Sequence, residues 1–336
     1  MARGYWVAHV GFVYARPNIV CFIENRPCPN ELGIFRGTMT AESGVIDQDA
    51  LPKVSIYIST CNRVDRLKRA VQSVLNQDYP NIEVLVCDDA SVDGTADYMA
   101  ELCAKDERVH YLRNEKNMGA CATRNLGIFT ASGKFIAGLD DDDEFTPDRI
   151  SFLVKNWDDQ YSFLCCNFKE VYSDGSHNIY YKQDEPLVAD YRALLFDNIA
   201  SNQIFTLTKN LQEIGGFDTR VRRLQDWDTW LRLAYSHGPF KRFPEYKYLM
   251  HHDHAKNEQR VSKSYPLSSA LNDLLQRNQN IYVGDDAKFM KFIVASSDKS
   301  ASLSESLYWT VKKTAPKYIV KYLLNKMNLN LGLIKS

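Results

Sequence analysis

The sequence predicts an α/β protein built on a mostly parallel sheet with helices on both faces. From residue 53 onward, short apolar runs rich in Val, Ile and Leu alternate with segments of helical periodicity. The connecting segments are long enough to be helical crossovers between parallel strands. In addition, the first four apolar runs each end in polar residues, as expected where parallel strands bring ligand-binding groups to one edge of a sheet.

The first half of this sheet is expected to alternate regularly between strands and helices. The expected strands cover residues 54–58, 82–87, 109–112 and 135–139. The expected helices cover residues 67–75, 95–105 and 121–130. Further strands are expected at 163–168 and 204–207. A later helix carries a core-facing stripe made of Trp227, Trp230, Leu231 and Ala234.

The N-terminal 50 residues depart from this pattern. Two β-prone runs flank Arg16-Pro17-Asn18, which predicts a small β-rich appendage and a candidate contact for a homo-oligomer. We therefore divide the chain into this appendage over 1–50, a sheet domain over 51–260 and a helical region over 261–336. The sheet domain has two halves, 51–145 and 146–260.

The C-terminal helical region carries an apolar and aromatic face with lysines beside it. The apolar positions are Tyr308, Val311, Ala315, Tyr318, Ile319, Tyr322 and Leu323, and the lysines are Lys312, Lys313, Lys317, Lys321 and Lys326. Pro316 must begin or kink a helix here. Such a face suits an anionic membrane surface, and it equally suits packing against the sheet domain with the lysines in solvent.

The overall composition restricts the kinds of partner and the cellular compartment that we expect for the protein. A net charge of −1 and a sequence pI of about 6.7 give no reason to expect a nucleic-acid partner. Eight cysteines without a CxxC pair favour a reducing cytosol. No segment approaches the roughly 18 apolar residues of a spanning helix. We expect a cytoplasmic protein, with peripheral attachment to the inner face of a plasma membrane as an alternative.

An acidic run at residues 140–144, with the sequence Asp-Asp-Asp-Asp-Glu, follows the fourth strand. Adjacent carboxylates repel one another, so they either face water or neutralise a cation. An all-oxygen cluster suits Mg²⁺ or Mn²⁺. The structural alternative is a solvated acidic turn.

Other polar residues are expected at the same edge of the sheet. They are Ser59, Thr60, Asn62 and Arg63 after the first strand, Asp88 and Asp89 after the second, and Asn114, Asn117 and Gly119 after the third. Turn and cap preferences explain some polar residues near strand ends, and they are the better account of Ser91, Asp93 and Gly94. Turn preference does not require convergence on one edge, which instead points to a ligand site.

These residues resemble the sequence blocks of family-two glycosyltransferases. The blocks are Val54–Arg63, Ser73–Gln77, Asp88–Thr95, Asn117–Gly119 with Ala122–Asn125, and Leu139–Asp143. The resemblance covers residues 53–255 and leaves out the N-terminal appendage. It implies a GT-A fold, which is Rossmann-like, and an inverting transfer of a sugar from a nucleotide donor.

The resemblance also implies a donor site. Ser59, Cys61 and Asp89 would hold the nucleotide base, with Asn62 and Arg63 beside them. A carboxylate can accept the imide N–H of uracil, so a UDP-sugar is the expected donor. Arg124 would lie near the diphosphate or the acidic run, although a surface ion pair is the structural alternative.

The acidic run would supply the DxD motif of the family as Asp140-x-Asp142. Asp142 is the first choice for the metal, and Asp140 contacts either the donor ribose or a water in the metal shell. Asp141 and Asp143 would support these two or face solvent, and we include Asp141 among the donor-site residues. The expected cofactor is Mn²⁺ or Mg²⁺, bound by one or two carboxylates together with phosphates and water.

The resemblance places a catalytic base just before the tryptophan-containing helix, where this chain has Asp226. Without that context Asp226 would be a cap or a partner of the helix dipole. Asp228 is the competing carboxylate, and Gln225 stands where the family commonly has Glu. Among the histidines, His252 is favoured as a metal neighbour and His254 is second. A solvent-exposed histidine cluster is the alternative.

Three classes of function are therefore open. The leading one is a metal-dependent hexosyltransferase that acts on a saccharide acceptor, in particular a lipid-linked one in O-antigen, capsule or other surface-glycan synthesis. The second is a nucleotidyltransferase or phosphohydrolase, which the lack of a Gly-rich P-loop disfavours. The third is a non-catalytic partner that binds a sugar nucleotide or glycan.

Overall fold

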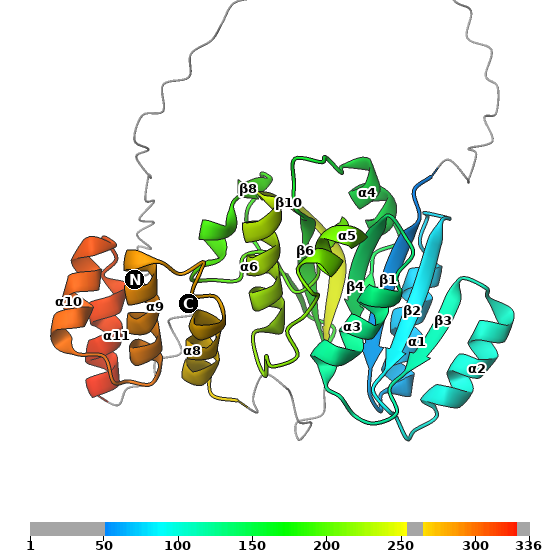
Figure 1. Cartoon of the computed structure of the whole chain (residues 1–336), viewed down its shortest axis with the longest axis horizontal. Helices are drawn as coiled ribbons and strands as arrows, with labels where there is room; N and C mark the ends of the chain where they lie inside the picture. Colours follow the sequence, from blue (N-terminus) through cyan, green and yellow to red (C-terminus); the bar gives the residue numbers. More distant parts are fainter. Residues whose placement is uncertain (1–50, 254–264, 328–336) are drawn as a thin grey trace, which may run out of the picture. The chain divides into compact units, whose positions relative to one another are not determined.

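The computed structural model describes residues 51–253 and 265–327 (Figure 1). Its described part contains one sheet in the order β3-β2-β1-β4-β9-β6-β10-β5, with β7 beside β6 and β8 beside β10. The strands are β1 (Val54–Thr60), β2 (Ile82–Asp88), β3 (Val109–Arg113), β4 (Phe135–Asp140), β5 (Glu144–Phe145), β6 (Leu164–Tyr172), β7 (His177–Ile179), β8 (Leu187–Ala189), β9 (Phe205–Leu207) and β10 (Phe240–His252). The appendage predicted for residues 1–50 lies outside the described residues.

Helices connect and flank these strands. They are α1 (Val64–Leu75), α2 (Thr95–Lys105), α3 (Ala120–Thr130), α4 (Arg149–Lys155), α5 (Thr208–Glu213), α6 (Gln225–His237), α8 (Leu267–Arg277), α9 (Gly284–Ser297), α10 (Leu303–Lys312) and α11 (Lys317–Lys326), with a short 3₁₀ turn, η2, at Tyr191–Leu194. The predicted α/β class, with helices on both faces of the sheet, is confirmed.

The first half of the sheet is parallel and brings its polar strand ends level with one another. β1 lies between β2 and β4, and β3 extends the row beyond β2. In this register Ser59 is opposite both Cys87 and Asp140, and Thr60 is opposite Asp88. The residues that follow these strands therefore share one edge, as the sequence pattern predicts.

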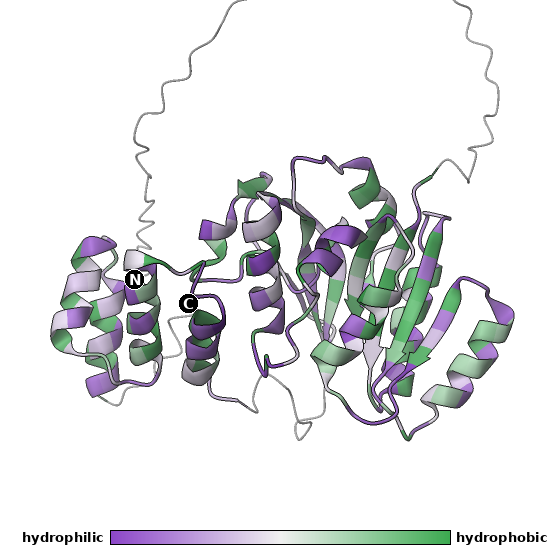
Figure 2. Ribbon diagram, viewed as in Figure 1, coloured by the Kyte–Doolittle hydropathy of each residue, from purple (hydrophilic) through white to green (hydrophobic). Residues whose placement is uncertain are grey.

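Alternate residues of the central strands enter two separate hydrophobic cores. Ile56 and Ile58 pack with Leu67 of α1 on one face, whereas Tyr57 packs with Cys121 and Ile128 of α3 on the other. Burial on both faces explains why these strands are apolar along their length (Figure 2). The sheet is therefore a rigid platform for the loops at its polar edge.

The second half of the sheet is mixed. β9 runs antiparallel to β4 and β6, while β10 runs parallel to β6. β10 is long and irregular, with register shifts between Phe243 and Tyr246 and between Tyr246 and Leu249. Its far end pairs with β5, so the segment just after the acidic run is tied to β10.

The C-terminal helices extend the core and then form a small cluster of their own. Leu271, Leu274 and Leu275 of α8 join the core that contains α3 and α6. Phe289 of α9 contacts Trp309 of α10 and Tyr318 of α11. Within 51–253 and 265–327, no helix combines the length and the apolar character needed to cross a bilayer. The proposed domain boundaries stay predictions.

Candidate active site

A pocket of about 510 Å³ lies at the polar edge of the sheet. Its walls come from the segments that follow β1, β2 and β4 and from the beginnings of α3 and α6. The lining residues are Ser59, Thr60, Cys61, Arg63, Asp89, Asn117, Gly119, Ala120, Thr123, Arg124, Asp140, Asp141, Asp142 and Gln225. Most of the residues singled out from the sequence are thus gathered in one place.

Asp141 is held by the loop that follows β1. The Thr60 hydroxyl donates to one of its carboxylate oxygens at 2.7 Å, and the Arg63 guanidinium donates to the other at 3.0 Å. Burial raises the pKa of Asp141 to about 6, and the charge of Arg63 opposes that shift. Arg63 also lies 3.4 Å from a carboxylate oxygen of Asp142, so a cation spans the two acids.

Asp143 is turned into the protein. The Tyr248 hydroxyl and the backbone N–H of His251 each donate to its carboxylate at 2.8 Å. Burial, followed by the charges of Asp142 and Asp140, raises its pKa well above the ordinary value. Asp143 therefore ties the acidic run to β10, while Asp140, Asp141 and Asp142 line the pocket.

Arg124 of α3 connects the acidic run to the beginning of α6. Its largely buried guanidinium donates to Asp140 at 3.0 Å and to the side-chain oxygen of Gln225 at 2.7 Å. The same group lies 3.9 Å from Asp226 and over the ring of Phe217. Arg124 therefore lies beside the acidic run, and its role toward a diphosphate stays a prediction. Gln225 therefore gives the Arg124 guanidinium an uncharged hydrogen-bond acceptor.

Asp226 lies in the first turn of α6 beside this cation. Burial raises the pKa of its carboxyl group to about 7; the charge of Arg124 lowers the pKa, and the charge of Asp140 raises it again. One carboxylate oxygen is buried without a hydrogen-bond partner among the described residues. A carboxylate with such a pKa can accept a proton near neutral pH.

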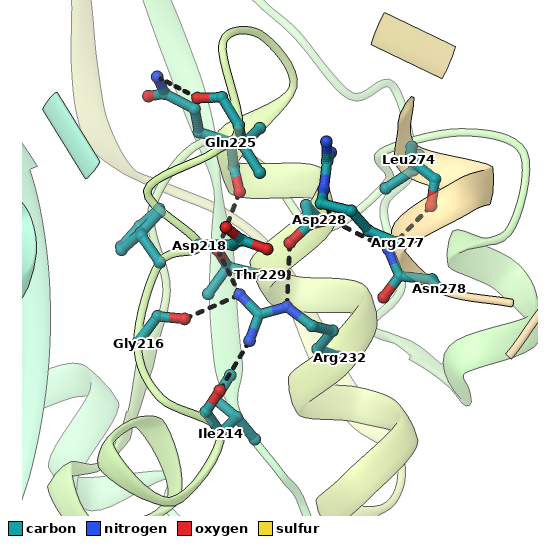
Figure 3. A network of polar contacts seen from close by, with 12 residues as sticks. Ile214, Gly216, Asp218, Gln225, Asp228, Thr229, Arg232, Leu274, Arg277 and Asn278 are labelled. Atoms are coloured by element: carbon teal, nitrogen blue, oxygen red, sulfur yellow. Dashed lines mark hydrogen bonds and ion pairs between the residues drawn. The ribbon is translucent and has the colours of Figure 1, made fainter. Parts of the chain in front are cut away.

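Asp228, two residues further along α6, has a different environment (Figure 3). Its carboxylate is 1% exposed and accepts from Arg232 at 2.9 Å, from Asn278 at 3.0 Å and from Arg277 at 3.3 Å. Arg232 in turn donates to backbone carbonyls before α6. Because these donors occupy its oxygens, Asp228 holds α6 to α8 and is not placed to accept a proton from a substrate.

Asp89 holds the segment that precedes α3 in place through hydrogen bonds. Its carboxylate accepts from the Asn114 side chain at 2.9 Å and from the backbone N–H groups of Met118 and Gly119 at 2.7 and 2.8 Å. Gly119 has φ +85°, which favours glycine at this turn. A carboxylate offers about four lone-pair positions, so roughly one remains for a ligand.

Asn62, Asp226 and His252 are not among the residues that line the pocket, although Asp226 lies beside the lining residue Arg124. The Asn62 side chain accepts from the backbone N–H of Val92 at 2.7 Å, which joins two loops. His252 lies 3.1 Å from Glu170 and stacks on Tyr172. Among the described histidines, His251 contacts the acidic segment, at 2.7 Å from Glu144. The assignment of His252 to a metal stays a prediction, and His254 lies outside the described residues.

Gln203 is a site residue that has no sequence motif. Its side-chain amide donates to the same Asp140 oxygen that Arg124 contacts, at 3.0 Å, and its carbonyl oxygen accepts from the Tyr57 hydroxyl at 3.4 Å. A Cβ atom at Gly138 would collide with both Gln203 and Tyr57. Only the three-dimensional structure brings this glutamine, from the loop before β9, to the end of β4.

In the residues that the structure describes, no group of three or more His, Cys, Asp or Glu side chains is arranged to hold a metal ion. Asp140 and Asp142 nevertheless face the pocket with oxygen ligands. Proteins commonly bind Mg²⁺ through one or two carboxylates, with substrate phosphates and water completing the coordination. The donor set therefore fits a divalent ion that arrives together with a diphosphate.

Comparison with known proteins agrees with this arrangement. Residues 55–220 match the model of glycosyl transferase family 2. The chain is 35% identical over 213 residues to WcaA of Escherichia coli K12, a colanic acid biosynthesis glycosyl transferase by name, covering 61% of this chain and 74% of that protein. It is 28% identical over 190 residues to TuaG of Bacillus subtilis, a teichuronic acid biosynthesis glycosyltransferase by name, covering 54% and 72% of the two chains.

A third relative shares a shorter region. It is a GalNAc(5)-diNAcBac-PP-undecaprenol β-1,3-glucosyltransferase of Campylobacter jejuni, 35% identical over 118 residues, covering 35% of this chain and 38% of that protein. Among solved structures, Staphylococcus aureus TarS superposes with a TM-score of 0.58 at 15% identity, covering 82% of this chain and 80% of that one. TarS therefore shares the fold. Together with the family match and the WcaA relationship, this shows that the chain belongs to glycosyl transferase family 2 and is an enzyme, a glycosyltransferase of the hexosyltransferase type.

Proposed function

We propose that this enzyme transfers a sugar from a UDP-sugar to a saccharide acceptor with inversion at the anomeric carbon, and that the reaction depends on a divalent metal. The observation that carries the proposal is the pair formed by Asp226 and Arg124, of which Arg124 lines the pocket. A partly buried carboxylate, whose side chain is 27% exposed and whose pKa is raised to about 7, lies beside a cation that also contacts Asp140. General-base catalysis needs a group of this kind.

The nucleotide would lie against the loops that follow β1 and β2. Ser59, Cys61 and Asp89 would surround the base, and the remaining acceptor position of Asp89 suits the N–H of uracil. Arg63 and Arg124 line the same pocket and would face the diphosphate. A volume of about 510 Å³ is in the range of small-ligand pockets. TarS, which has the same fold, has been crystallised with UDP-GlcNAc, a donor of this class.

Asp140 and Asp142 would hold Mn²⁺ or Mg²⁺ together with the donor phosphates, as a DxD motif. The bound ion would neutralise the negative charge that develops on the departing diphosphate. Arg124 contributes in the same direction, since its fixed guanidinium lies between Asp140 and Asp226. Asp141 and Asp143 keep the acidic run in place through Thr60, Arg63, Tyr248 and His251.

The base step uses Asp226. The acceptor hydroxyl gives its proton to the Asp226 carboxylate as its oxygen forms a bond to the anomeric carbon. The bond from that carbon to the phosphate oxygen breaks on the opposite face, and UDP leaves with the bonding electrons. The pKa of about 7 lets Asp226 take the proton near neutral pH.

The acceptor is proposed to be a saccharide in the synthesis of a bacterial surface polysaccharide, and in particular a lipid-linked saccharide such as an O-antigen or capsule precursor. Two relatives carry polysaccharide biosynthesis in their names, and a third is named for an undecaprenol-linked acceptor. Nothing in the described residues favours the alternatives, which are a nucleotidyltransferase or phosphohydrolase and a non-catalytic partner that binds a sugar nucleotide or glycan.

Isothermal titration calorimetry tests the donor site. UDP, GDP and CDP would be titrated with and without Mn²⁺ into the wild type, Asp142→Asn and the control Asp97→Asn, which changes an exposed acid on α2. We expect Mn²⁺-dependent binding of UDP in preference to GDP and CDP. Loss of one of two carboxylates facing the metal should weaken that binding by at least about tenfold, equivalent to 1.4 kcal/mol.

The control variant should bind UDP as the wild type does. Binding of UDP that is independent of Mn²⁺, or equal affinity for all three nucleotides, would contradict the proposed donor site. Equal affinity of Asp142→Asn and the wild type in Mn²⁺ would remove the acidic run from it.

A further inference from the structure

The last two described helices carry apolar side chains that no other described element covers. On α10, Leu303, Leu307 and Val311 recur every four residues and are 46%, 47% and 76% exposed. The opposite side of the helix is occupied, because Trp309 is buried against Phe289 of α9. Residues spaced by four lie on one face of a helix, so α10 has an exposed apolar stripe.

α11 has a second stripe of the same kind. Val320, Leu323 and Met327 follow one another at intervals of three and four residues and are 44%, 50% and 65% exposed. Tyr318, on another face, packs against Phe289. α11 contains no fully buried residue although six of its ten residues are apolar or aromatic. α10 and α11 lie next to each other (Figure 1), and the backbone N–H of Ile319 donates to the Thr310 hydroxyl.

Several lysines lie on or next to the same two helices as these stripes. In the described part of the chain, Lys313, Lys317, Lys321 and Lys326 form no ion pair with a carboxylate, whereas Lys312 is paired with Asp285. Burial is the main cause of the lowered pKa of Lys321, and the charge of Lys317 lowers it further.

The helix pair offers little negative charge of its own. The single carboxylate between residues 303 and 327 belongs to Glu305. That group closes the capping box of α10 with Ser302. The surface of the two helices is therefore apolar and basic at once.

We propose that the helix pair, residues 303–327, lies on an anionic lipid bilayer with the two stripes turned toward the acyl chains. Interfacial helices combine an apolar face with flanking lysines, which reach anionic headgroups. A second copy of the chain suits this surface less well, because a two-fold contact would bring the unpaired lysines of both copies together. With ten residues each, α10 and α11 would lie in the interface without crossing it.

This inference is independent of the donor site, but it deepens the proposed function, since a membrane-bound enzyme can meet a lipid-linked acceptor. Co-sedimentation of the full chain with vesicles tests it. One set contains phosphatidylcholine alone and the other phosphatidylcholine mixed with phosphatidylglycerol. Binding to the anionic vesicles is expected, with weaker binding at high salt and little to the neutral ones.

Two double variants separate the charge from the apolar stripe. Lys317→Glu/Lys321→Glu and Val320→Ser/Leu323→Ser should each lower the affinity for anionic vesicles by at least about tenfold, because the first reverses two charges near the headgroups and the second removes apolar side chains from the acyl region. The matched controls are Lys105→Glu on α2 and Val188→Ser on β8, both exposed and remote in sequence. Thermal unfolding followed by circular dichroism checks that each variant is folded.

Binding that the two double variants leave unchanged would overturn the proposal, because another part of the chain would then hold the vesicles. Failure to bind anionic vesicles would overturn it as well. A dimer in the wild type that Val320→Ser/Leu323→Ser dissociates would assign the stripes to a second copy instead. UDP titration of the same variants separates this question from the donor site, because UDP binding should be unchanged in all of them.

Discussion

Asp226 and Asp228 lie two residues apart in the first turn of α6, yet their surroundings assign them to different tasks. Asp228 is surrounded by donors from Arg232, Arg277 and Asn278. Asp226 has a buried oxygen without a hydrogen-bond partner among the described residues, and its charged neighbour is Arg124 at 3.9 Å. From sequence alone both are acids at a helix N-terminus. Only the tertiary structure distinguishes their roles.

The proposed role of Asp226 predicts the pH dependence of the reaction. The carboxyl group must be ionised to accept a proton, and its pKa is raised to about 7, mainly by burial. The value of kcat/KM for the donor should therefore fall as the pH is lowered through about 7. Initial rates measured from about pH 5 to about pH 9 check this. A decline that begins only near the ordinary aspartate pKa of about 4 would exclude Asp226 as the base.

Gln203 is expected to position Asp140 for the donor. Gln203→Met keeps the length of the side chain but removes the hydrogen bonds to Asp140 and Tyr57. The two hydrogen bonds together contribute about 1–2 kcal/mol to holding Asp140 in position for the donor. Their loss should therefore raise the donor KM roughly five- to thirtyfold. Steady-state kinetics of the variant measures this effect. Gln212→Met, which removes a hydrogen bond to the backbone of Ile128 away from the pocket, is the control and should leave KM unchanged.

At the scale of single elements, a small residue in β4 makes room for side chains that contact Asp140. Gly138 has no Cβ, so Gln203 and the Tyr57 ring can approach the strand just before Asp140. Gly138→Ala should lower the free energy of unfolding by about 1–3 kcal/mol because the added methyl group overpacks this contact. Urea unfolding measures the loss. Gly94→Ala, where no atom lies within 4 Å of the added Cβ, should change stability by less than about 0.5 kcal/mol.

The elements that the sequence predicts well are those with a strong local pattern. β1, β2 and β4 are largely apolar runs, and the helices between them have regular apolar spacing. The 13-residue strand β10 is less evident, because Pro244 and several charged residues interrupt it and its register shifts twice. Gln203 has no local signal, since its place in the site depends on how β9 returns beside β4.

At the scale of the whole molecule, the Asp228 network joins α8 to the elements around the candidate active site. It connects α6, the turn before α6 and the end of α8 through one buried carboxylate (Figure 3). Asp228→Ala would leave the guanidinium groups of Arg232 and Arg277 without their shared partner. We expect a loss of about 3–5 kcal/mol in the free energy of unfolding, measured by urea titration.

Asp226→Asn provides the contrast in the same experiment. The pKa of Asp226 is higher in the folded than in the unfolded chain, so ionisation of this group destabilises the fold as the pH rises through about 7. At about pH 8 the neutral variant should therefore be as stable as the wild type or more stable. Equal losses of unfolding free energy in Asp228→Ala and Asp226→Asn would contradict the assignment of a structural role to Asp228 and a catalytic role to Asp226.

The most direct test of the account is the turnover of Asp226→Asn. UDP release from a panel of UDP-sugars, with water or a saccharide acceptor, would be measured beside calorimetric binding of UDP and Mn²⁺. We predict that kcat falls by about 10²-fold or more while UDP affinity stays within about twofold of the wild type. Turnover close to that of the wild type would contradict the assignment of Asp226 as the base.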